Sequence, residues 1–335
     1  MSLVKQYGKA IKKLVFGNTL FPQEFFIGLN EPQEEITVWL HGMGQPIDVT
    51  SHHSMACAAP LTLCIAFERK YGVNKHKHAS LSLKFCMRDE PKRVLGEISL
   101  KWMEQILVNG MELSLFQIRS SSNHCLSKIR LGFHYLLHSY MQLGRHNTPD
   151  MKMSFLERRA AMVWFICPRP VVLVSLCDGF LGNIFPMNIM GDLGNGYFAF
   201  ALKDSRRAAH LVERIGRIAV SSLPMSQASL AYKLAVNHTK DFIDWEELPF
   251  ATKMSPILNV PVPIFAQRVR EMEVVRVSGI GSHNFFVARI LSDETIASEP
   301  VLSVIHGFYQ ALRLKIRTAE MPASLEEDYF AKRGF

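Results

Sequence analysis

One continuous stretch, from Pro168 to Pro224, constrains the fold of this chain most. It contains the apolar run V-V-L-V-S-L, an Asp-Gly turn, a second apolar run Y-F-A-F-A-L, and then Lys203-Asp204-Ser205. Short runs rich in Val, Phe and Tyr with turn residues between them are typical of strands. An amphipathic segment, A-A-H-L-V-E-R-I-G, follows the serine and predicts a helix. The stretch therefore predicts a strand that leads directly into the start of a helix.

The predicted helix start has the chemistry of an anion site. Ser205 is placed to cap the helix, and the first backbone N–H groups of a helix, with its dipole, favour a negative group. Lys203, Arg206 and Arg207 add positive charge around the same point. The alternative interpretation is an ordinary capped helix with surface arginines.

Composition places the chain among folded proteins. It has 335 residues, with 48% hydrophobic and 20% charged residues, which is enough for two ordinary domains or one large one. No window holds about twenty uninterrupted apolar residues, so no membrane span is predicted. The basic amphipathic N-terminus lacks a long apolar core and a cleavage site, and we interpret it as a first helix covering one end of the fold, not as a targeting signal.

The charge of the chain limits the classes of partner it can bind, and its cysteines indicate the cellular compartment. The formal net charge is +8, but the basic residues are scattered, and a nucleic-acid surface would need a concentrated basic face. Anionic small ligands fit this balance equally well. The six cysteines form no C-x-x-C pair and most lie in apolar runs, which predicts buried free thiols and a reducing compartment, the cytoplasm.

The chain contains two halves that resemble each other. A polar segment from Leu143 to Asp150 separates them. The strand-like runs 36–40 and 61–67 of the first half correspond to 171–176 and 197–202 of the second. The runs 112–118 and 283–291 also correspond, and a segment with the predicted helix residues Gly-Phe follows each of them. We predict a duplicated, mainly β (α+β) fold of two tandem barrel-like domains, 1–150 and 151–335.

The second half also carries extra residues, centred on 237–262. Pro256, Pro261 and Pro263 exclude a regular central strand in this segment. Two interpretations stay open: a loop or lid that covers a ligand, and plain surface wrapping.

Three blocks within residues 160–292 resemble the flavin reductase-like, FMN-binding split-barrel family. The first block is the strand from Pro170 to Leu176 with the turns Asp178-Gly179 and Gly182-Asn183. The resemblance implies that the segment after this strand lies along the flavin ring and ribityl chain. An ordinary hairpin is the alternative. In the flavin-binding interpretation, the residues that the resemblance places at the flavin are Asn183, Ile184, Met187 and Asn188.

The other two blocks resemble the segments of the family that bind the flavin phosphate and that lie near the flavin ring. Lys203-Asp204-Ser205 is similar to a Lys-Asp-Thr step that receives the flavin phosphate, and I-G-R-I-A-V follows it as in the family. The third block, G-S-H-N-F-F-V-A, resembles a Gly-Asp-His strand start, which would place His283 near the flavin ring or a nicotinamide. Ser282 stands where the family commonly has Asp, which puts a proton-handling role in doubt.

The first half departs from this pattern. Its counterpart of the phosphate step falls near 68–70, where no capped amphipathic helix follows. We interpret this half as a degenerate copy without its own phosphate cradle. A fused pseudo-dimer would let it complete the site of the second half, with His52, His53 and Ser54 as candidates.

Other motifs predict no chemistry. His52-His53 and His76-x-His78 lack cysteine or carboxylate neighbours at ligand spacing, so no metal site is predicted. The Gly-x-Gly pairs at 42–44 and 279–281 lack the surroundings of a dinucleotide fingerprint. Cys57 lies in an apolar setting that favours an inert thiol.

The resemblance implies a flavin-binding oxidoreductase of flavin reductase type, with hydride passing between NAD(P)H and FMN. FAD is the alternative flavin. A non-catalytic split barrel that binds flavin or haem, and an interaction protein with a decayed site, stay open as other functions. The expected partners are small flavin and nicotinamide molecules, within a homodimer or an intrachain pseudo-dimer.

Overall fold

The computed structural model describes residues 24–31, 33–67, 80–143, 153–179 and 181–316. The predicted N-terminal helix, the 68–70 counterpart of the phosphate step and the histidines at 76 and 78 lie outside these residues. Among the described residues, helices that are long and apolar enough to cross a membrane are absent.

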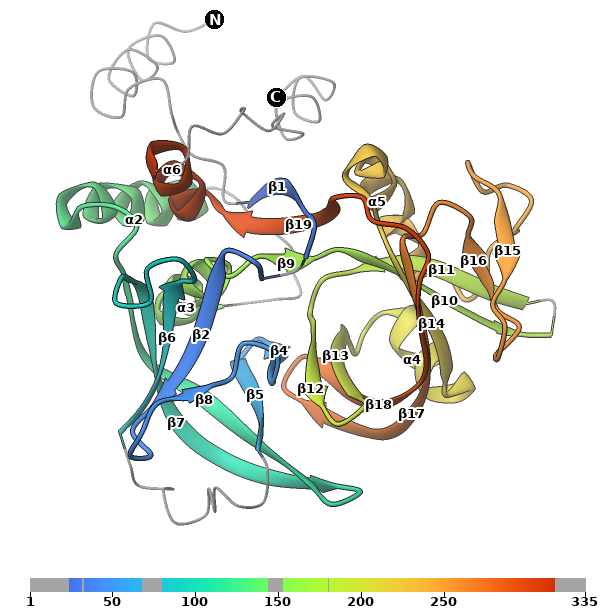
Figure 1. Ribbon diagram of the computed structural model, residues 1–335, viewed down its shortest axis with the longest axis horizontal. Helices are drawn as coiled ribbons and strands as arrows, with labels where there is room; N and C mark the ends of the chain where they lie inside the picture. Colours follow the sequence, from blue (N-terminus) through green and yellow to red (C-terminus); the bar gives the residue numbers. More distant parts are fainter. Residues whose placement is uncertain (1–23, 32, 68–79, 144–152, 180, 317–335) are drawn as a thin grey trace, which may run out of the picture.

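Two seven-stranded antiparallel sheets, which we call the first and second barrels, form most of the structure (Figure 1). The first barrel has the order β3-β2-β6-β7-β8-β5-β4 and the second has β11-β10-β14-β17-β18-β13-β12. Strands of the first barrel are β2 (Ile36–His41), β3 (Ile47–Asp48), β4 (His53–Ala58), β5 (Leu61–Phe67), β6 (Leu81–Met87), β7 (Val94–Val108) and β8 (Met111–Asn123). Strands of the second are β10 (Val172–Asp178), β11 (Leu181–Met187), β12 (Met190–Gly194), β13 (Tyr197–Lys203), β14 (Arg217–Ser222), β17 (Arg268–Ile280) and β18 (His283–Thr295).

The two strand orders are the same. When β2 to β8 are numbered along the chain and compared with β10 to β14, β17 and β18, each strand has a counterpart with the same neighbours. The corresponding runs found in the sequence are β2 and β10, β5 and β13, and β8 and β18. The mainly β fold is confirmed, and the shared strand order is what a duplicated chain requires.

Asn-Gly turns close the hairpins β7–β8 and β12–β13. Asn109 and Gly110 have φ of 46° and 89°, and Asn195 and Gly196 have 52° and 76°. Two successive residues with positive φ are the signature of the tight turn that fits the twist of two antiparallel strands. These two hairpins are therefore determined by local sequence.

A shared core and a third sheet join the barrels. Strand β4 of the first packs against β12, β13 and β18 of the second, and β5 also contacts β12. Buried Ala56 and Ala66 belong to the same apolar cluster as Ala199 and Ala201. The third sheet has the order β1-β19-β9 and consists of β1 (Glu24–Leu29), β19 (Val301–His306) and β9 (Arg169–Pro170). The small side chains of the alanines let the two barrels approach closely, which is the arrangement that an intrachain pseudo-dimer requires.

The helices do not follow the predicted division at residue 150. Helix α3 (Phe155–Trp164), which begins with a capping box between Ser154 and Glu157, packs in the core of the first barrel. Helix α6 (Gly307–Ile316) adds Phe308 and Tyr309 to that same core. The other helices are α2 (Lys128–Leu143), α4 (Arg207–Ile215) and α5 (Ser229–Leu234), with 3-10 turns η3 (Met225–Gln227) and η4 (Ala235–Thr239).

The extra segment of the second half covers strand β11. Its strands β15 (Thr252–Met254) and β16 (Pro261–Pro263) pair only with each other, as the prolines predicted. The Ile243 N–H donates to the Gly182 carbonyl at 2.9 Å, and the absence of a side chain at Gly182 leaves room for the Trp245 ring.

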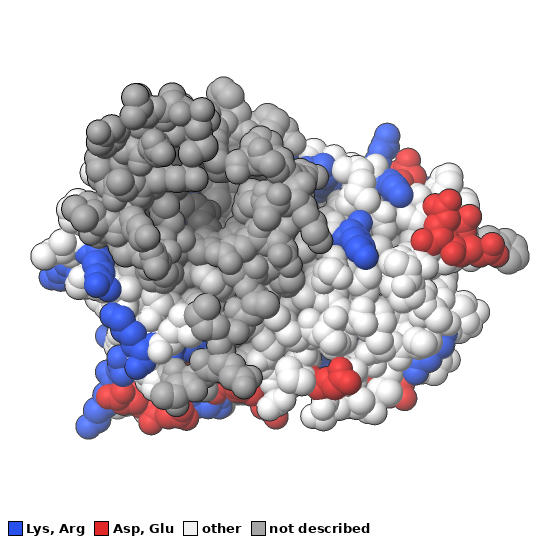
Figure 2. Space-filling view, turned by 90° about the horizontal axis from the view of Figure 1, so that it is seen from above, with Lys and Arg blue, Asp and Glu red and all other residues white. Residues whose placement is uncertain are grey.

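All six cysteines are free thiols, and five of them are buried while Cys177 is half-buried. On the face shown in Figure 2, the described Lys and Arg side chains lie at several separate places, with Asp and Glu between them. The positive charge is thus not gathered into one patch on this face.

Candidate functional site

The predicted anion site lies where β13 ends and α4 begins. The chain turns after Lys203, with the Arg206 N–H donating to the Lys203 carbonyl at 3.0 Å. Arg206 is the N-cap residue of α4, and no side chain caps the helix. The prediction that Ser205 caps the helix is wrong, because this turn delays the first helical residue to Arg207.

The missing side-chain cap leaves this helix start suited to an external anion. The first N–H groups of a helix have no partner within it, and they carry the positive end of the dipole. Lys203 and Arg206 are half-buried here, whereas Ser205 and Arg207 are exposed. Arg207 Nε lies 3.8 Å from Asp241 Oδ1, and both side chains are more than half exposed, so this ion pair is weak.

The third sequence block lies beside the second. His283 at the start of β18 is the cross-strand partner of Lys203, and the Asp204 N–H donates to the Ser282 carbonyl at 3.1 Å. The pKa of His283 is lowered to about 4, chiefly by burial; Asp204 opposes this shift and Lys203 adds to it. The imidazole is therefore neutral at pH 7.

Residues of the first half reach this place, although not those predicted. His283 Nδ1 lies 2.9 Å from Ser282 Oγ and 3.6 Å from the buried Cys57 Sγ of β4. The Ser282 N–H also donates to the Ala59 carbonyl at 3.0 Å. Sequence reasoning set Cys57 aside as an inert thiol, because nothing local shows that it meets His283.

His52, His53 and Ser54 lie instead against β12. A side chain at Gly191 would come within 2.2 Å of the His53 carbonyl, and one at Gly194 within 2.7 Å of the His52 ring. The two glycines allow this approach because they lack a Cβ. The segment thus contacts the second barrel through its backbone and the His52 ring.

His53 itself belongs to a buried cluster. Its ring accepts a hydrogen bond from Arg169 at 2.8 Å, and that guanidinium lies 3.9 Å above the centre of the Trp164 ring. Burial, with Arg169 nearby, holds the pKa of His53 well below its usual value. Within the described ranges, His, Cys, Asp and Glu side chains form no group of three or more that could hold a metal ion.

The first sequence block is largely occupied by the chain itself. Both N–H bonds of the Asn183 amide go to carbonyls of the extra segment, those of Asn237 at 3.0 Å and Lys240 at 2.9 Å. The Asn237 amide returns a bond to the Ile184 carbonyl. Ile184 and Met187 are buried in apolar clusters, and Asn188 is half-buried.

Turn η4 connects this block to the start of α4. His238 Nε2 lies 2.8 Å from the Pro186 carbonyl. Burial lowers the pKa of His238, and the positive charge of Arg206 lowers it further. The end of β11, the start of α4 and the start of β18 therefore surround one region of the second barrel.

A phosphorylated flavin fits this region in part. The uncapped helix start with Lys203, Arg206 and Arg207 fits a phosphate. The Asn183 amide has no N–H left for a ring, and only its Oδ1 lacks a partner among the described residues. The flavin roles predicted for the side chains of the first block stay predictions.

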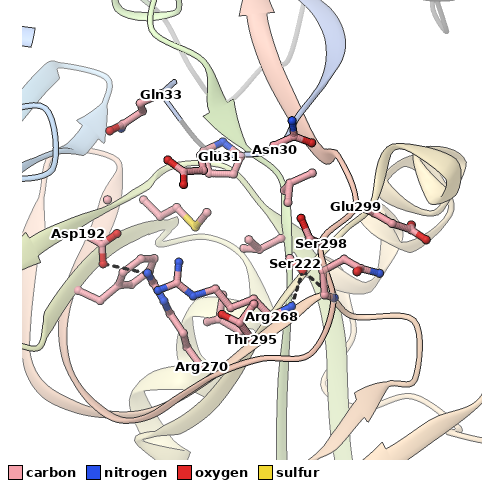
Figure 3. A pocket seen from close by; sticks show the side chains of 18 of the residues that line it. Asn30, Glu31, Gln33, Asp192, Ser222, Arg268, Arg270, Thr295, Ser298 and Glu299 are labelled. Carbon is pink, nitrogen blue, oxygen red and sulfur yellow. Dashed lines mark hydrogen bonds and ion pairs between the residues drawn. The ribbon is translucent and has the colours of Figure 1, made fainter. Parts of the chain in front are cut away.

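A cavity of about 510 Å³ lies elsewhere, at one end of the second barrel (Figure 3). None of the residues predicted to bind flavin lines it. Sequence reasoning missed it because its charged residues, which include Asp192 of β12 and Arg268 and Arg270 of β17, come from segments far apart in the chain.

Solved structures of flavin proteins resemble part of this chain. The NADH:FAD oxidoreductase of Streptomyces globisporus matches with 16% identity and a TM-score of 0.39, covering 45% of this chain and 89% of its own. The flavin reductase component of a bacterial two-component tryptophan halogenase has 17% identity and a TM-score of 0.40 over 45% and 94%. An FMN-binding protein from Thermus thermophilus has 21% identity and a TM-score of 0.36 over 41% and 79%.

No family model matches this sequence, and no curated protein matches it. The predicted resemblance to flavin reductase and FMN-binding split-barrel proteins is confirmed as a likeness of fold over about 45% of the chain. The activities in the names above belong to those proteins.

Proposed function

We propose that this protein is a flavin-binding oxidoreductase of flavin reductase type that passes hydride between NAD(P)H and FMN. One observation supports this most: the uncapped start of α4, with Lys203, Arg206 and Arg207, lies beside the buried His283. A bound flavin supplies the hydride chemistry in such a protein, while the protein supplies binding and electrostatics.

Each group has a separate role in this proposal. Lys203, Arg206 and the first N–H groups of α4 hold the phosphate, since charge-assisted hydrogen bonds to a phosphate are strong. His283 presents a neutral imidazole, which Ser282 and Cys57 orient through Nδ1. We infer that it positions a ring by hydrogen bonding and carries no charge in doing so.

A second candidate is a flavin binder without turnover. The occupied amide of Asn183 favours it, because a reductase needs room beside the ring for a nicotinamide. FMN is our choice over FAD because the charged groups that we assign lie at one helix start. None of the three proteins named above is described as binding haem.

Absorbance of the purified protein tests flavin binding first. We expect an absorbance band at about 450 nm after incubation with FMN, as for a bound oxidised flavin. Lys203→Ala with Arg206→Ala should weaken FMN binding by about 1–3 kcal/mol, the cost of lost charge-assisted hydrogen bonds. Arg214→Ala, an exposed cation in the last turn of α4, is the matched control.

NADH oxidation in the presence of FMN then separates the two candidates. Turnover that falls in the Lys203/Arg206 variant and persists in the Arg214 variant supports the reductase. Binding without turnover supports the second candidate. Equal FMN titration curves for all three proteins would refute the phosphate assignment.

A further inference from the structure

We propose that the cavity at one end of the second barrel binds a small molecule with an apolar body, hydrogen-bond donors and no negative charge. This inference does not depend on the flavin proposal, since the cavity shares no residue with the start of α4.

The cavity is lined by three parts of the chain. Its volume of about 510 Å³ is in the usual range for small-molecule sites. The second barrel gives an apolar wall with Val172, Phe198 and Val220. Asn30, Glu31 and Gln33 of the first half line a second side, and Ala297, Ser298 and Glu299 between β18 and β19 line a third, as the close-up shows (Figure 3).

The arginines in the cavity already have carboxylate partners. Arg268 Nε lies 2.6 Å from Asp293 Oδ1. Arg270 Nε lies 3.1 Å from the other oxygen of Asp293, and Arg270 Nη1 lies 2.9 Å from Asp192 Oδ1. The Arg270 side chain is only 12% exposed, so this network is fixed against the wall. The positive charge that an incoming anion would need is therefore already offset by Asp192 and Asp293.

The remaining charge of the site is negative. Glu31 and Glu299 also line the cavity and are exposed. Together with Asp192, which lines the cavity, and Asp293, which pairs with its arginines, four carboxylates lie in or next to the cavity against two guanidinium groups among the described residues. This balance repels phosphates and carboxylates and attracts cationic donors, and it does not act against neutral ones.

The side-chain oxygen of Gln267 is a buried hydrogen-bond acceptor that a ligand donor would satisfy. Gln267 lines the cavity and is 8% exposed, and its Nε2 donates to the Phe265 carbonyl at 2.9 Å. Its Oε1 is buried without a hydrogen-bond partner among the described residues. A buried acceptor without a partner is costly, and a ligand N–H or O–H would satisfy it.

Three probes of one shape test the charge rule: benzamidine, benzamide and benzoate. Titrated into the full chain and followed by calorimetry or ligand-observed NMR, benzamidine and benzamide should bind and benzoate should not. Benzoate that binds as tightly as benzamide, or no binding of any probe, overturns the proposal.

Two variants locate the binding in the cavity. Glu31→Gln with Glu299→Gln should weaken benzamidine by about three- to tenfold and leave benzamide unchanged, as expected for exposed charges. Glu247→Gln, an exposed acid outside the cavity, is the control and should change neither. Ser298→Trp should block both probes by filling the cavity, with circular dichroism to check folding. Unchanged binding in a folded Ser298→Trp variant, or equal losses in the charge variant and its control, would place the probes elsewhere.

Discussion

The two barrels share a strand order but differ at one end. In the first barrel, Gly96 of β7 pairs with Phe85 of β6, and α3 fills the space beside them. A side chain at Gly96 would lie 2.7 Å from both Val163 and Ile166. Trp164 of the same helix packs edge-on against Phe85.

At the corresponding end of the second barrel, Arg270 of β17 pairs with Val220 of β14, and both line the cavity. One copy is thus closed by a helix and the other by an ion-pair network around an open space. The difference shows that the same end of a duplicated fold can be filled by a helix in one copy and can hold a candidate binding cavity in the other.

Acid should have the largest effect on the free energy of unfolding, and two of the three histidines concerned pack in the first barrel, which α3 closes. His53 contacts Trp164 and His306 contacts Phe308, and burial lowers the pKa of both histidines, that of His306 to about 3. A folded-state pKa below the unfolded value near 6.5 gives stability that is complete above pH 6.5 and is lost as pH falls. Together with His283 of the second barrel, these three histidines should each account for a loss of about 2 kcal/mol at pH 5, roughly 6 kcal/mol from the three.

Urea unfolding at pH 7 and pH 5 measures this loss. A His306→Gln variant is the internal control, because it should lose about 2 kcal/mol less between the two pH values. A free energy of unfolding that stays constant or rises on acidification would contradict the assignment of neutral buried histidines.

Trp164→Ala should have the next largest effect. The side chain is 2% exposed and touches Phe85, His53 and Arg169, so its removal should cost about 3–5 kcal/mol. The half-buried Trp245 of the extra segment is the matched site, and Trp245→Ala should cost less. Equal losses in urea unfolding would mean that α3 does not close the first barrel.

A pair of valines sharpens the same comparison. Val163 is fully buried in the packed end, whereas Val220 lies on the cavity wall. Val163→Ala should cost about 2 kcal/mol, and Val220→Ala about 1 kcal/mol less, since fewer packed atoms lose a neighbour there. Urea unfolding of the two variants, side by side, checks the sign of the difference.

Arg207→Ala should have the smallest effect on folding. Its ion pair with Asp241 is exposed, so the free energy of unfolding should change by less than about 0.5 kcal/mol. FMN affinity should nevertheless fall if the start of α4 holds a phosphate. A large loss of stability, or no change in FMN titration, would separate this residue from the proposed site.

Much of the fold was predictable because it is encoded locally. The runs that became β5 and β13 follow from β-branched and aromatic residues, and Asn109-Gly110 requires a tight turn. The site was less predictable. Sequence order placed Lys203 before a helix, but only the structure shows that the helix begins at Arg207. Only tertiary contacts show that the extra segment occupies Asn183 and that Cys57 meets His283.

The sequence by itself therefore determined two similar sets of strands and a cationic step between a strand and a helix. These depend on the local preferences and side-chain periodicity of short segments. Tertiary structure alone decided that α3, which lies beyond residue 150, closes the first barrel, and that Arg268, Arg270, Asp192 and Asp293 meet around a cavity in the second. Packing and ion pairing join residues whose separation along the chain carries no signal, so the open end of the second barrel appears only when the strands are brought together.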